Sequence, residues 1–191
     1  MNVESLIEAK NIAYTINGNK LFHNLSFTLN KGEVLRICGS NGSGKSTLIR
    51  IILGITKQTK GKITTQNTCN VSYLGHKNAL KNYLSVSDNL IIQELNHHKG
   101  LNDALEKLDL KNFLDVTVGN LSYGQQKKLA LLRVFLNESN LIILDEPFVG
   151  LDSTAFNIVQ YFLIKEINIG KALIFTSHID CSIESKILDL R

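Results

Sequence analysis

The chain has 191 residues, of which 43% are hydrophobic and 20% are charged, and its net charge is +4. This composition is typical of one globular domain with a sizeable core, and no apolar run approaches the roughly 20 residues of a membrane-spanning helix, so any work at a membrane must use a partner's spans. The densest basic group, Lys127 and Lys128 with Arg133, is interpreted as a solvated helix face, which argues against a nucleic-acid-binding surface.

The N-terminal portion predicts a small antiparallel β layer. Residues 6–16 and 25–29 have the composition of strands, and Asn17-Gly18-Asn19 between them is a strong turn signal. Tyr14 lies in the first of these strands, where its ring could stack on a purine. A half-buried strand tyrosine is an almost equally good interpretation.

A glycine-rich loop follows the next predicted strand, residues 34–38, and precedes a predicted helix at 46–53. The loop fits G-x-x-x-x-G-K-[ST], the pattern of a phosphate-binding loop. Its glycines let successive N–H groups point inward as an anion nest, and the helix start adds its positive dipole end. The candidate nucleotide-binding residues are Gly39, Ser40, Asn41, Gly42, Ser43, Gly44, Lys45, Ser46 and Thr47.

Two of these side chains have specific expected roles. Lys45 can reach the β- and γ-phosphates of a nucleotide, and the Ser46 hydroxyl can bind Mg²⁺. The alternative is a plain glycine-rich turn between a strand and a helix, which the flanking structure disfavours.

A helical segment is predicted after two short strands at 61–64 and 71–74. Residues 77–120 carry apolar residues at helical spacing, and Ser87-Asp88 offers an N-cap for the first helix. We interpret this segment as a small helical subdomain inserted into the sheet domain.

The core then resumes with a helix at 125–136, a buried strand at 141–144, a helix at 153–169 capped by Ser153, and a strand at 172–176. Strands that alternate with helices around a phosphate loop imply a mainly parallel sheet. The fold class is therefore α/β, in a single domain over residues 1–191.

Three polar residues follow the last two buried strands, at the sheet edge where α/β proteins bind ligands. Asp145 can hold the Mg²⁺ shell, and Glu146 can orient or deprotonate the attacking water. His178 could donate a hydrogen bond to the γ-phosphate. The alternatives are a surface turn for the acidic pair and a structural role for the histidine.

A second anion site is predicted where the helix before the Asp145 strand begins. The helix opens with Leu121-Ser122-Tyr123-Gly124-Gln125; Ser122 can cap it, and its exposed N–H groups form the second anion site. One chain needs only one phosphate loop, so a second such helix start indicates use in trans. Taken alone, it is an ordinary helix cap.

Together these motifs resemble the nucleotide-binding subunit of ABC transporters over essentially the whole chain. The matches are residues 39–47 with Walker A, 141–146 with Walker B, 121–125 with the LSGGQ signature (Tyr123 replacing a glycine), Leu151-Asp152 with the D-loop, and His178 with the switch histidine.

The resemblance implies a P-loop NTPase fold, with a RecA-like parallel core, an N-terminal antiparallel β layer and an inserted helical subdomain. It also implies an ATPase that uses ATP and Mg²⁺. Such subunits form head-to-tail homodimers in the ATP-bound state, with each ATP between one phosphate loop and the other subunit's signature, and dimer closure drives membrane partners.

One departure points to a branch of this family. The glutamine expected after strand 71–74 is missing, and Gly75-His76 stands there. This pair resembles the ATP-binding subunit of the cytochrome c maturation system, also called the heme exporter, as do residues 25–29, 84–90 and 184–187. His76 would contact Mg²⁺ or water, although imidazole is a poorer ligand for a hard cation than an amide oxygen. Relaying contact to a membrane subunit is an equal alternative for His76.

The branch implies an ATPase docked peripherally on the cytoplasmic side of an inner membrane, with integral membrane subunits of the cytochrome c maturation permease type as partners. It would drive heme export or release of the heme chaperone. The sequence shows no evident heme site and no nucleic-acid surface. The alternatives are an ABC transporter subunit for another solute and, more remotely, a soluble ABC-type ATPase acting on nucleic acid or the ribosome.

Overall fold

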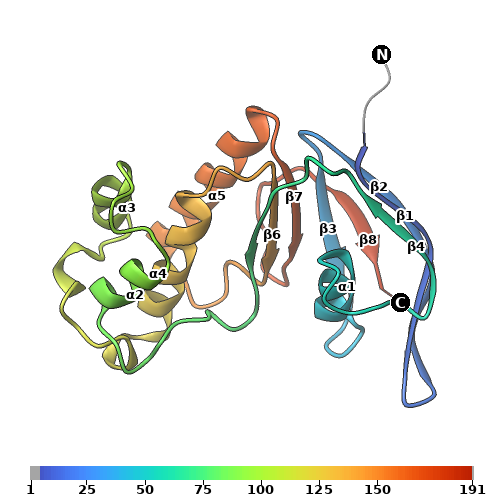
Figure 1. Cartoon of the computed structure of the whole chain (residues 1–191), viewed down its shortest axis with the longest axis horizontal. Helices are drawn as coiled ribbons and strands as arrows, with labels where there is room; N and C mark the ends of the chain where they lie inside the picture. The colour runs from blue at the N-terminus through green and yellow to red at the C-terminus, as the bar shows by residue number, and fades with distance from the viewer. Residues whose placement is uncertain (1–4, 191) are drawn as a thin grey trace.

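The computed structural model describes residues 5–190 and contains two sheets (Figure 1). Residues 1–4 and 191 of the predicted domain lie outside the described part. The first sheet is antiparallel, in the order β2-β1-β4, and the second is parallel, in the order β5-β6-β7-β3-β8. The strands are β1 (Ser5–Ile16), β2 (Asn19–Asn30), β3 (Val34–Cys38), β4 (Lys60–Thr65), β5 (Val71–Leu74), β6 (Leu141–Asp145), β7 (Ala172–Thr176) and β8 (Lys186–Asp189).

The helices occupy both faces of the parallel sheet. Helix α1 lies on the side of the antiparallel sheet, whereas α4 and α5 lie on the opposite side, next to the segment that holds α2 and α3 (Figure 1). The helices are α1 (Lys45–Ile52), α2 (Val86–Ile92), α3 (Leu101–Lys107), α4 (Tyr123–Phe135) and α5 (Ser153–Asn168), with short 3₁₀ turns η1 (Lys111–Phe113) and η2 (Val118–Asn120). No helix within residues 5–190 has the length and apolarity that a bilayer crossing requires.

Strand β6 shows how the sequence forms two cores. Side chains alternate across a strand, so Leu141 and Ile143 join the apolar cluster around α1, while Ile142 and Leu144 join the cluster around α4 and α5. All four are buried, and burying each such side chain stabilises the fold by about 1.5–3 kcal/mol. The apolar run is continuous because both faces of a parallel sheet are covered.

Helix α4 belongs to two clusters at once. Its Leu129 and Leu132 pack in a third cluster with α2 and α3, whereas Ala130, Leu131 and Val134 pack against the parallel sheet. Apolar residues of the segment 77–120 therefore pack against the face of α4 that carries Leu129 and Leu132. Its status as a separate subdomain stays a prediction.

The structure differs from the sequence prediction at two helix starts. Helix α2 is capped by Ser85, not by Ser87-Asp88: the Ser85 hydroxyl accepts from the Asp88 N–H (3.0 Å), and the Asp88 carboxylate accepts from the Ser85 N–H (3.1 Å). This reciprocal pair is a capping box, which satisfies two backbone donors. Helix α5 is capped by Asp152 rather than Ser153, because the Asp152 carboxylate accepts from the Ala155 N–H (2.8 Å).

Two strands also differ. Strand β2 runs from Asn19 to Asn30 rather than over 25–29, because pairing with β1 extends the strand through residues 19–24, where exposed polar residues flank the buried Phe22. The short strand β8 was not predicted. It is charged at both ends and forms by parallel pairing with β3, a long-range contact that local composition does not reveal.

The antiparallel sheet contains a bulge that only glycine fits. The register of β1 against β4 shifts between Lys10 and Ala13, and Gly61 (φ +84°) lies opposite the shift. A Cβ at Gly61 would lie 2.4 Å from the carbonyl oxygens of Lys10 and Asn11. Gly18, in the turn between β1 and β2, also has positive φ (+79°), but a Cβ there would meet nothing within 4 Å.

These two glycines form a matched pair for a stability test. Gly18→Ala should cost only the left-handed strain, about 1–2 kcal/mol of unfolding free energy, whereas Gly61→Ala adds a backbone clash and should cost at least about 3 kcal/mol. Urea unfolding midpoints of the two variants and the wild type measure the difference. Equal losses would contradict the close approach of β4 to the β1 bulge.

Candidate nucleotide site

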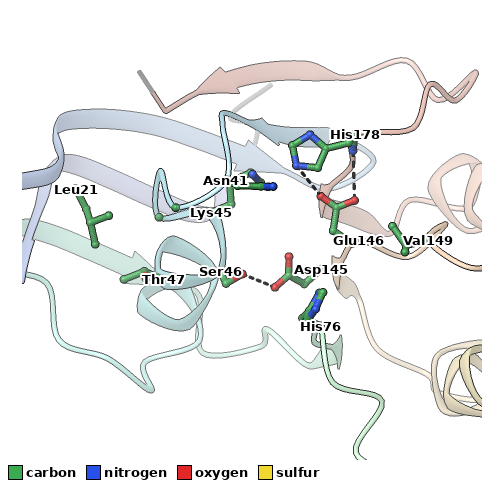
Figure 2. A pocket seen from close by; sticks show the side chains of 12 residues that line it. Leu21, Asn41, Lys45, Ser46, Thr47, His76, Asp145, Glu146, Val149 and His178 are labelled. Carbon is green, nitrogen blue, oxygen red and sulfur yellow. Dashed lines mark hydrogen bonds and ion pairs between the residues drawn. The ribbon is translucent and has the colours of Figure 1, made fainter. Parts of the chain in front are cut away.

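A cavity of about 520 Å³ opens at the carboxyl ends of β3 and β6 (Figure 2). This volume is in the range of small-ligand sites. Its walls come from the phosphate loop, the residues after β5, β6 and β7, and the hairpin strand β2. The lining residues are Leu21, Asn41, Gly42, Gly44, Lys45, Ser46, Thr47, His76, Asp145, Glu146, Val149 and His178.

The backbone of the phosphate loop is closely held before α1 begins. Gly44 is the N-cap residue of α1 and has φ +101°. Because glycine has no side chain that could cap the helix, the first helical N–H groups are left to another acceptor. A Cβ on Gly44 would lie 3.0 Å from the Phe22 ring of β2. The glycine thus permits both the turn and its contact with the antiparallel sheet, and it leaves an anion-binding helix start facing the cavity.

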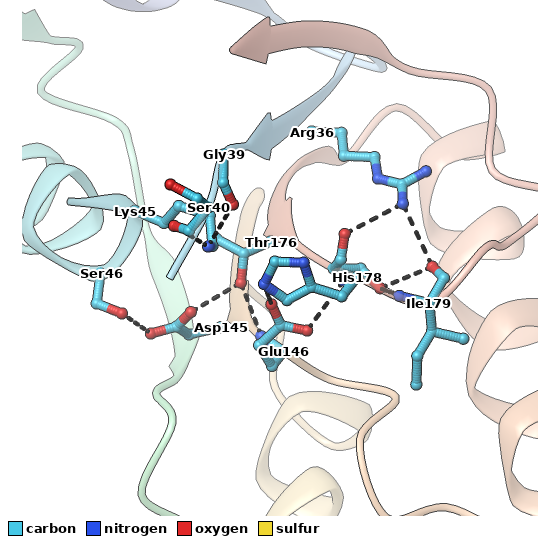
Figure 3. A network of polar contacts seen from close by, with 11 residues as sticks. Arg36, Gly39, Ser40, Lys45, Ser46, Asp145, Glu146, Thr176, His178 and Ile179 are labelled. Carbon is cyan, nitrogen blue, oxygen red and sulfur yellow. Dashed lines mark hydrogen bonds and ion pairs between the residues drawn. The ribbon is translucent and has the colours of Figure 1, made fainter. Parts of the chain in front are cut away.

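Lys45 supplies the positive charge of the loop. Its Nζ donates to the carbonyl oxygens of Gly39 (2.8 Å) and Ser40 (3.1 Å) (Figure 3). The ammonium group is therefore held over the loop while its side chain lines the cavity. This arrangement fits the recognition of phosphate by backbone N–H groups and a lysine.

Asp145 joins the loop to the sheet. One carboxylate oxygen accepts from the Ser46 hydroxyl and the other from the Thr176 hydroxyl, each at 2.7 Å (Figures 2 and 3). The residue is only 3% exposed, so both hydrogen bonds replace lost water.

The donor set around Asp145 suits Mg²⁺ better than a metal that needs an all-protein cage. The described residues contain no group of three or more His, Cys, Asp or Glu side chains that could hold a metal. Mg²⁺ usually takes one or two protein oxygen ligands and completes its shell with water and substrate phosphate, which Ser46 and Asp145 can provide. His76 lines the same cavity and lies near Asp145 (Figure 2).

Glu146 is held in a strained backbone conformation next to His178. Its φ is +52°, unusual for a non-glycine residue and frequent at functional sites. Its N–H donates to the Thr176 hydroxyl (2.9 Å), and its Oε2 accepts from the His178 N–H (3.3 Å). Its Oε1 is buried, accepts no hydrogen bond from any of residues 5–190, and lies 3.5 Å from His178 Nε2 (Figure 3). This oxygen is available to accept a proton or a hydrogen bond from a ligand.

A buried cation near this carboxylate pair was missed by the sequence analysis. Lys127 of α4 is 1% exposed, so the interpretation of Lys127 as part of a solvated helix face was wrong. Burial lowers the pKa of Lys127 to about 8, while the charges of Asp145 and Glu146 oppose that shift. The sequence does indicate this burial: Ala130, Leu131 and Val134 lie three, four and seven residues after Lys127. Residues at this spacing share a helix face with Lys127, and here that face is apolar.

The candidate signature residues lie away from the cavity. Ser122 and Gln125 form a capping box, in which the Ser122 hydroxyl accepts from the Gln125 N–H (3.2 Å) and the Gln125 side chain accepts from the Ser122 N–H (2.9 Å). A Cβ on Gly124 would lie 2.6 Å from the Gly150 carbonyl oxygen, so α4 starts in close contact with the loop after β6. None of these three residues lines the cavity.

Other predicted residues have different positions. Tyr14 does not line the cavity; it is partly buried in the α1 cluster, with its ring centroid 6.2 Å from that of Phe22. Gly39, Ser40 and Ser43 belong to the loop but not to the cavity wall. Leu21 and Val149 do line it, and no motif in the sequence indicated them.

The phosphate loop, the Asp145–Glu146 pair and His178 thus meet in one cavity, and comparison with known proteins agrees. Residues 22–149 match the ABC transporter family model. The chain belongs to the ABC transporter family.

Similar members of this family share a single description, cytochrome c biogenesis ATP-binding export protein CcmA. The protein from Nitrosococcus oceani is 38% identical, over 83% of this chain and 79% of that protein. The protein from Aliivibrio fischeri is 32% identical over 94% and 95%, and that from Escherichia coli K12 is 33% identical over 95% and 94%. The chain is therefore an ABC ATP-binding subunit related to these proteins.

Solved structures of ABC proteins share the fold. An ABC transporter of metal-chelate type in an inward-facing conformation superimposes with a TM-score of 0.78 at 28% identity, over 98% of this chain and 80% of that one. An ABC transporter ATP-binding protein from Pyrococcus furiosus superimposes with a TM-score of 0.79 at 23% identity, over 96% of both chains. The predicted P-loop ABC fold class is confirmed.

The depressed pKa of Lys127 predicts a pH-dependent stability. Between pH 8 and about 10.5 the unfolded lysine binds a proton that the folded one has lost, so this residue makes stability rise with pH in that window. Below pH 8 the buried charge carries its full cost, about 3 kcal/mol. Lys127→Met should therefore be more stable than the wild type at pH 7, and the difference should shrink towards pH 10.

Urea unfolding of both chains without nucleotide or metal, at pH 7, 8.5 and 10, measures this difference, because other titrating groups affect both equally. Lys128→Met is the control: Lys128 forms an ion pair with the half-exposed Asp152 (2.8 Å), so its loss should produce no such convergence. A stability difference for Lys127→Met that stays constant across this pH range would contradict the buried, depressed lysine.

Proposed function

We propose that this ABC ATP-binding subunit hydrolyses ATP to power a complex for cytochrome c biogenesis, in heme export or release of the heme chaperone. The observation that carries the ATPase assignment is the position of Asp145 and Glu146. Asp145 is joined to Ser46 of the phosphate loop, and Glu146 lines the same cavity with one carboxylate oxygen 3.5 Å from His178 Nε2. The relatives named for cytochrome c biogenesis support the pathway.

The residues divide the work as follows. The loop N–H groups and Lys45 bind the phosphates. Ser46 and Asp145 would hold Mg²⁺, which neutralises phosphate charge when bound, and His76 stands where a further contact to the metal or its water would come. Glu146 accepts a proton from the attacking water while the oxygen of that water bonds to the γ-phosphorus. The bond from the γ-phosphorus to the β–γ bridging oxygen breaks, which leaves ADP and phosphate.

The signature residues support a site completed by a second copy. Ser122, Gly124 and Gln125 lie outside the cavity of their own chain, at an exposed helix start suited to an anion. We assign them to the nucleotide of the partner subunit in an ATP-bound homodimer. Integral membrane subunits of the cytochrome c maturation permease type would complete the complex, with this chain on the cytoplasmic face of an inner membrane.

Replacing the base should trap the dimer. Glu146→Gln removes the proton acceptor but keeps the shape, so hydrolysis should fall by about 10²-fold or more while ATP binding persists. Size-exclusion chromatography with ATP and Mg²⁺ should then show a dimer, and EDTA should return it to monomer. The double variant with Lys45→Ala is the control that should stay monomeric. Hydrolysis by Glu146→Gln at the normal rate would show that Glu146 is not the base.

The pathway is tested in a cell that lacks its own copy of the related subunit. The wild-type chain should restore c-type cytochromes, measured by heme staining of membrane fractions, and Glu146→Gln should not. Normal maturation with Glu146→Gln would exclude the cytochrome c role but not the ATPase assignment. It would favour the alternative, a transporter subunit for another solute.

A further inference from the structure

We propose that Arg36 is a positioning residue for ATP hydrolysis, which sets the place of His178 by holding the backbone on both sides of it. The inference rests on the proposed ATPase function, in which His178 would donate a hydrogen bond to the γ-phosphate, and it deepens that role. Arg36 lies in the middle of β3, paired with Phe175 of β7 and Ile187 of β8. It does not line the nucleotide cavity.

One guanidinium nitrogen bridges the turn that carries His178. The Arg36 Nη2 donates to the carbonyl oxygens of Ser177 (3.1 Å) and Ile179 (3.4 Å), the residues before and after the histidine (Figure 3). The Arg36 side chain is 19% exposed. Its charge-assisted bond to Ser177 is partly buried, whereas the bond to Ile179 is exposed. Arg36 thus connects the turn to a central strand of the parallel sheet.

The turn has an internal brace that complements this link. The Ser177 hydroxyl donates to the Ile179 carbonyl (2.8 Å) and accepts from the Ile179 N–H (3.0 Å). Ser177 therefore fixes the shape of the turn, and Arg36 fixes its position. The guanidinium also lies 5.9 Å from the centroid of the Phe175 ring, whereas its ion pair with the fully exposed Asp180 is long, at 3.9 Å, and contributes little.

The backbone has to place His178 because its side chain is not packed. The imidazole is 53% exposed, and its Nε2 lies 3.5 Å from Glu146 Oε1. The His178 N–H donates to the other Glu146 oxygen at 3.3 Å. A turn released from β3 would therefore move both contacts to Glu146. A displacement of about 1 Å at a catalytic group can cost up to 10²-fold in rate.

An arginine at this position is poorly explained by fold stability alone. Its neighbours Leu35 and Ile37 are buried apolar residues, and the Arg36 Nε is buried without a hydrogen-bond partner among residues 5–190. An unsatisfied buried donor is destabilising, and an apolar residue in the strand would avoid it. The two bonds to the His178 turn are what an apolar residue could not make.

A double-mutant cycle of Arg36→Met with His178→Ala tests this inference. Methionine keeps the apolar length of the side chain and removes the donors. Steady-state ATP hydrolysis of the full-length chain is measured at protein concentrations that saturate the rate, for wild type, both single variants and the double variant. Asp180→Asn is the matched control, since it removes only the exposed contact of Arg36 and should hydrolyse ATP at the wild-type rate.

We expect Arg36→Met to lower kcat about tenfold with KM for ATP within about twofold, and to add less than about twofold when His178 is already alanine. An equal loss in both backgrounds, a wild-type kcat for Arg36→Met, or a loss confined to KM would overturn the inference. If thermal melting shows that Arg36→Met does not fold, Arg36→Gln, whose side chain is shorter and uncharged, goes through the same cycle with the same criteria.

The cycle also separates this inference from the function on which it rests. If His178→Ala hydrolyses ATP at the wild-type rate, the role proposed for His178 fails and the positioning role of Arg36 fails with it. If His178→Ala is slow but the effects of the two substitutions multiply, the inference about Arg36 alone fails.

Discussion

The buried carboxylate of Asp145 is the interaction on which the site depends. It is bonded to a hydroxyl of α1 on one side and to a hydroxyl of β7 on the other, so it joins the phosphate loop to two neighbouring strands of the parallel sheet. A carboxylate buried to this extent is tolerated only when its oxygens are satisfied. The same bonds therefore stabilise the charge and set the distance between the loop and the strand edge where a nucleotide's metal would lie.

Thr176 extends this constraint to Glu146. Its hydroxyl donates to Asp145 and accepts from the Glu146 N–H, so one side chain of β7 fixes both acidic residues. The turn that follows β7 carries His178, whose N–H donates to the Glu146 carboxylate. The positions of the candidate base and histidine thus follow from the end of β7, and Arg36 connects that strand end to β3, the strand that leads into the phosphate loop.

Much of this could be predicted from sequence because the motifs are local. A continuous apolar run fixes where a buried strand ends, so Asp145, Glu146 and His178 could be assigned to one sheet edge, and the glycines before Lys45 specify the loop. What could not be predicted depends on long-range contacts. The burial of Lys127 depends on which face of α4 the sheet covers, and the bonds of Arg36 join residues 141 and 143 positions apart.

Strand β8 and the position of Tyr14 illustrate the same limit. A four-residue strand with charged ends has no distinctive pattern, and it exists because β3 offers it a pairing edge. The sequence around Tyr14 fits either a tyrosine that stacks on a base or an ordinary strand tyrosine. Only the packing of β1 against β2 places its ring near Phe22, away from the cavity wall. Local chemistry therefore indicated the candidate phosphate-binding groups, while packing determined which other side chains lie near them.

Helix α4 carries both the candidate signature residues and the buried Lys127 near the carboxylate pair. Its first turn carries the signature residues, its next turn places Lys127 near Asp145 and Glu146, and its later residues pack in two apolar clusters at once. A change in charge at the carboxylate pair would therefore act on the same helix that carries the candidate signature residues Ser122 and Gly124. The segment that holds α2 and α3 packs on Leu129 and Leu132 of this helix, so a shift of α4 relative to the sheet would carry that segment with it. One helix thus carries the candidate signature residues, the buried Lys127 near the carboxylate pair and the packing surface for the segment that holds α2 and α3.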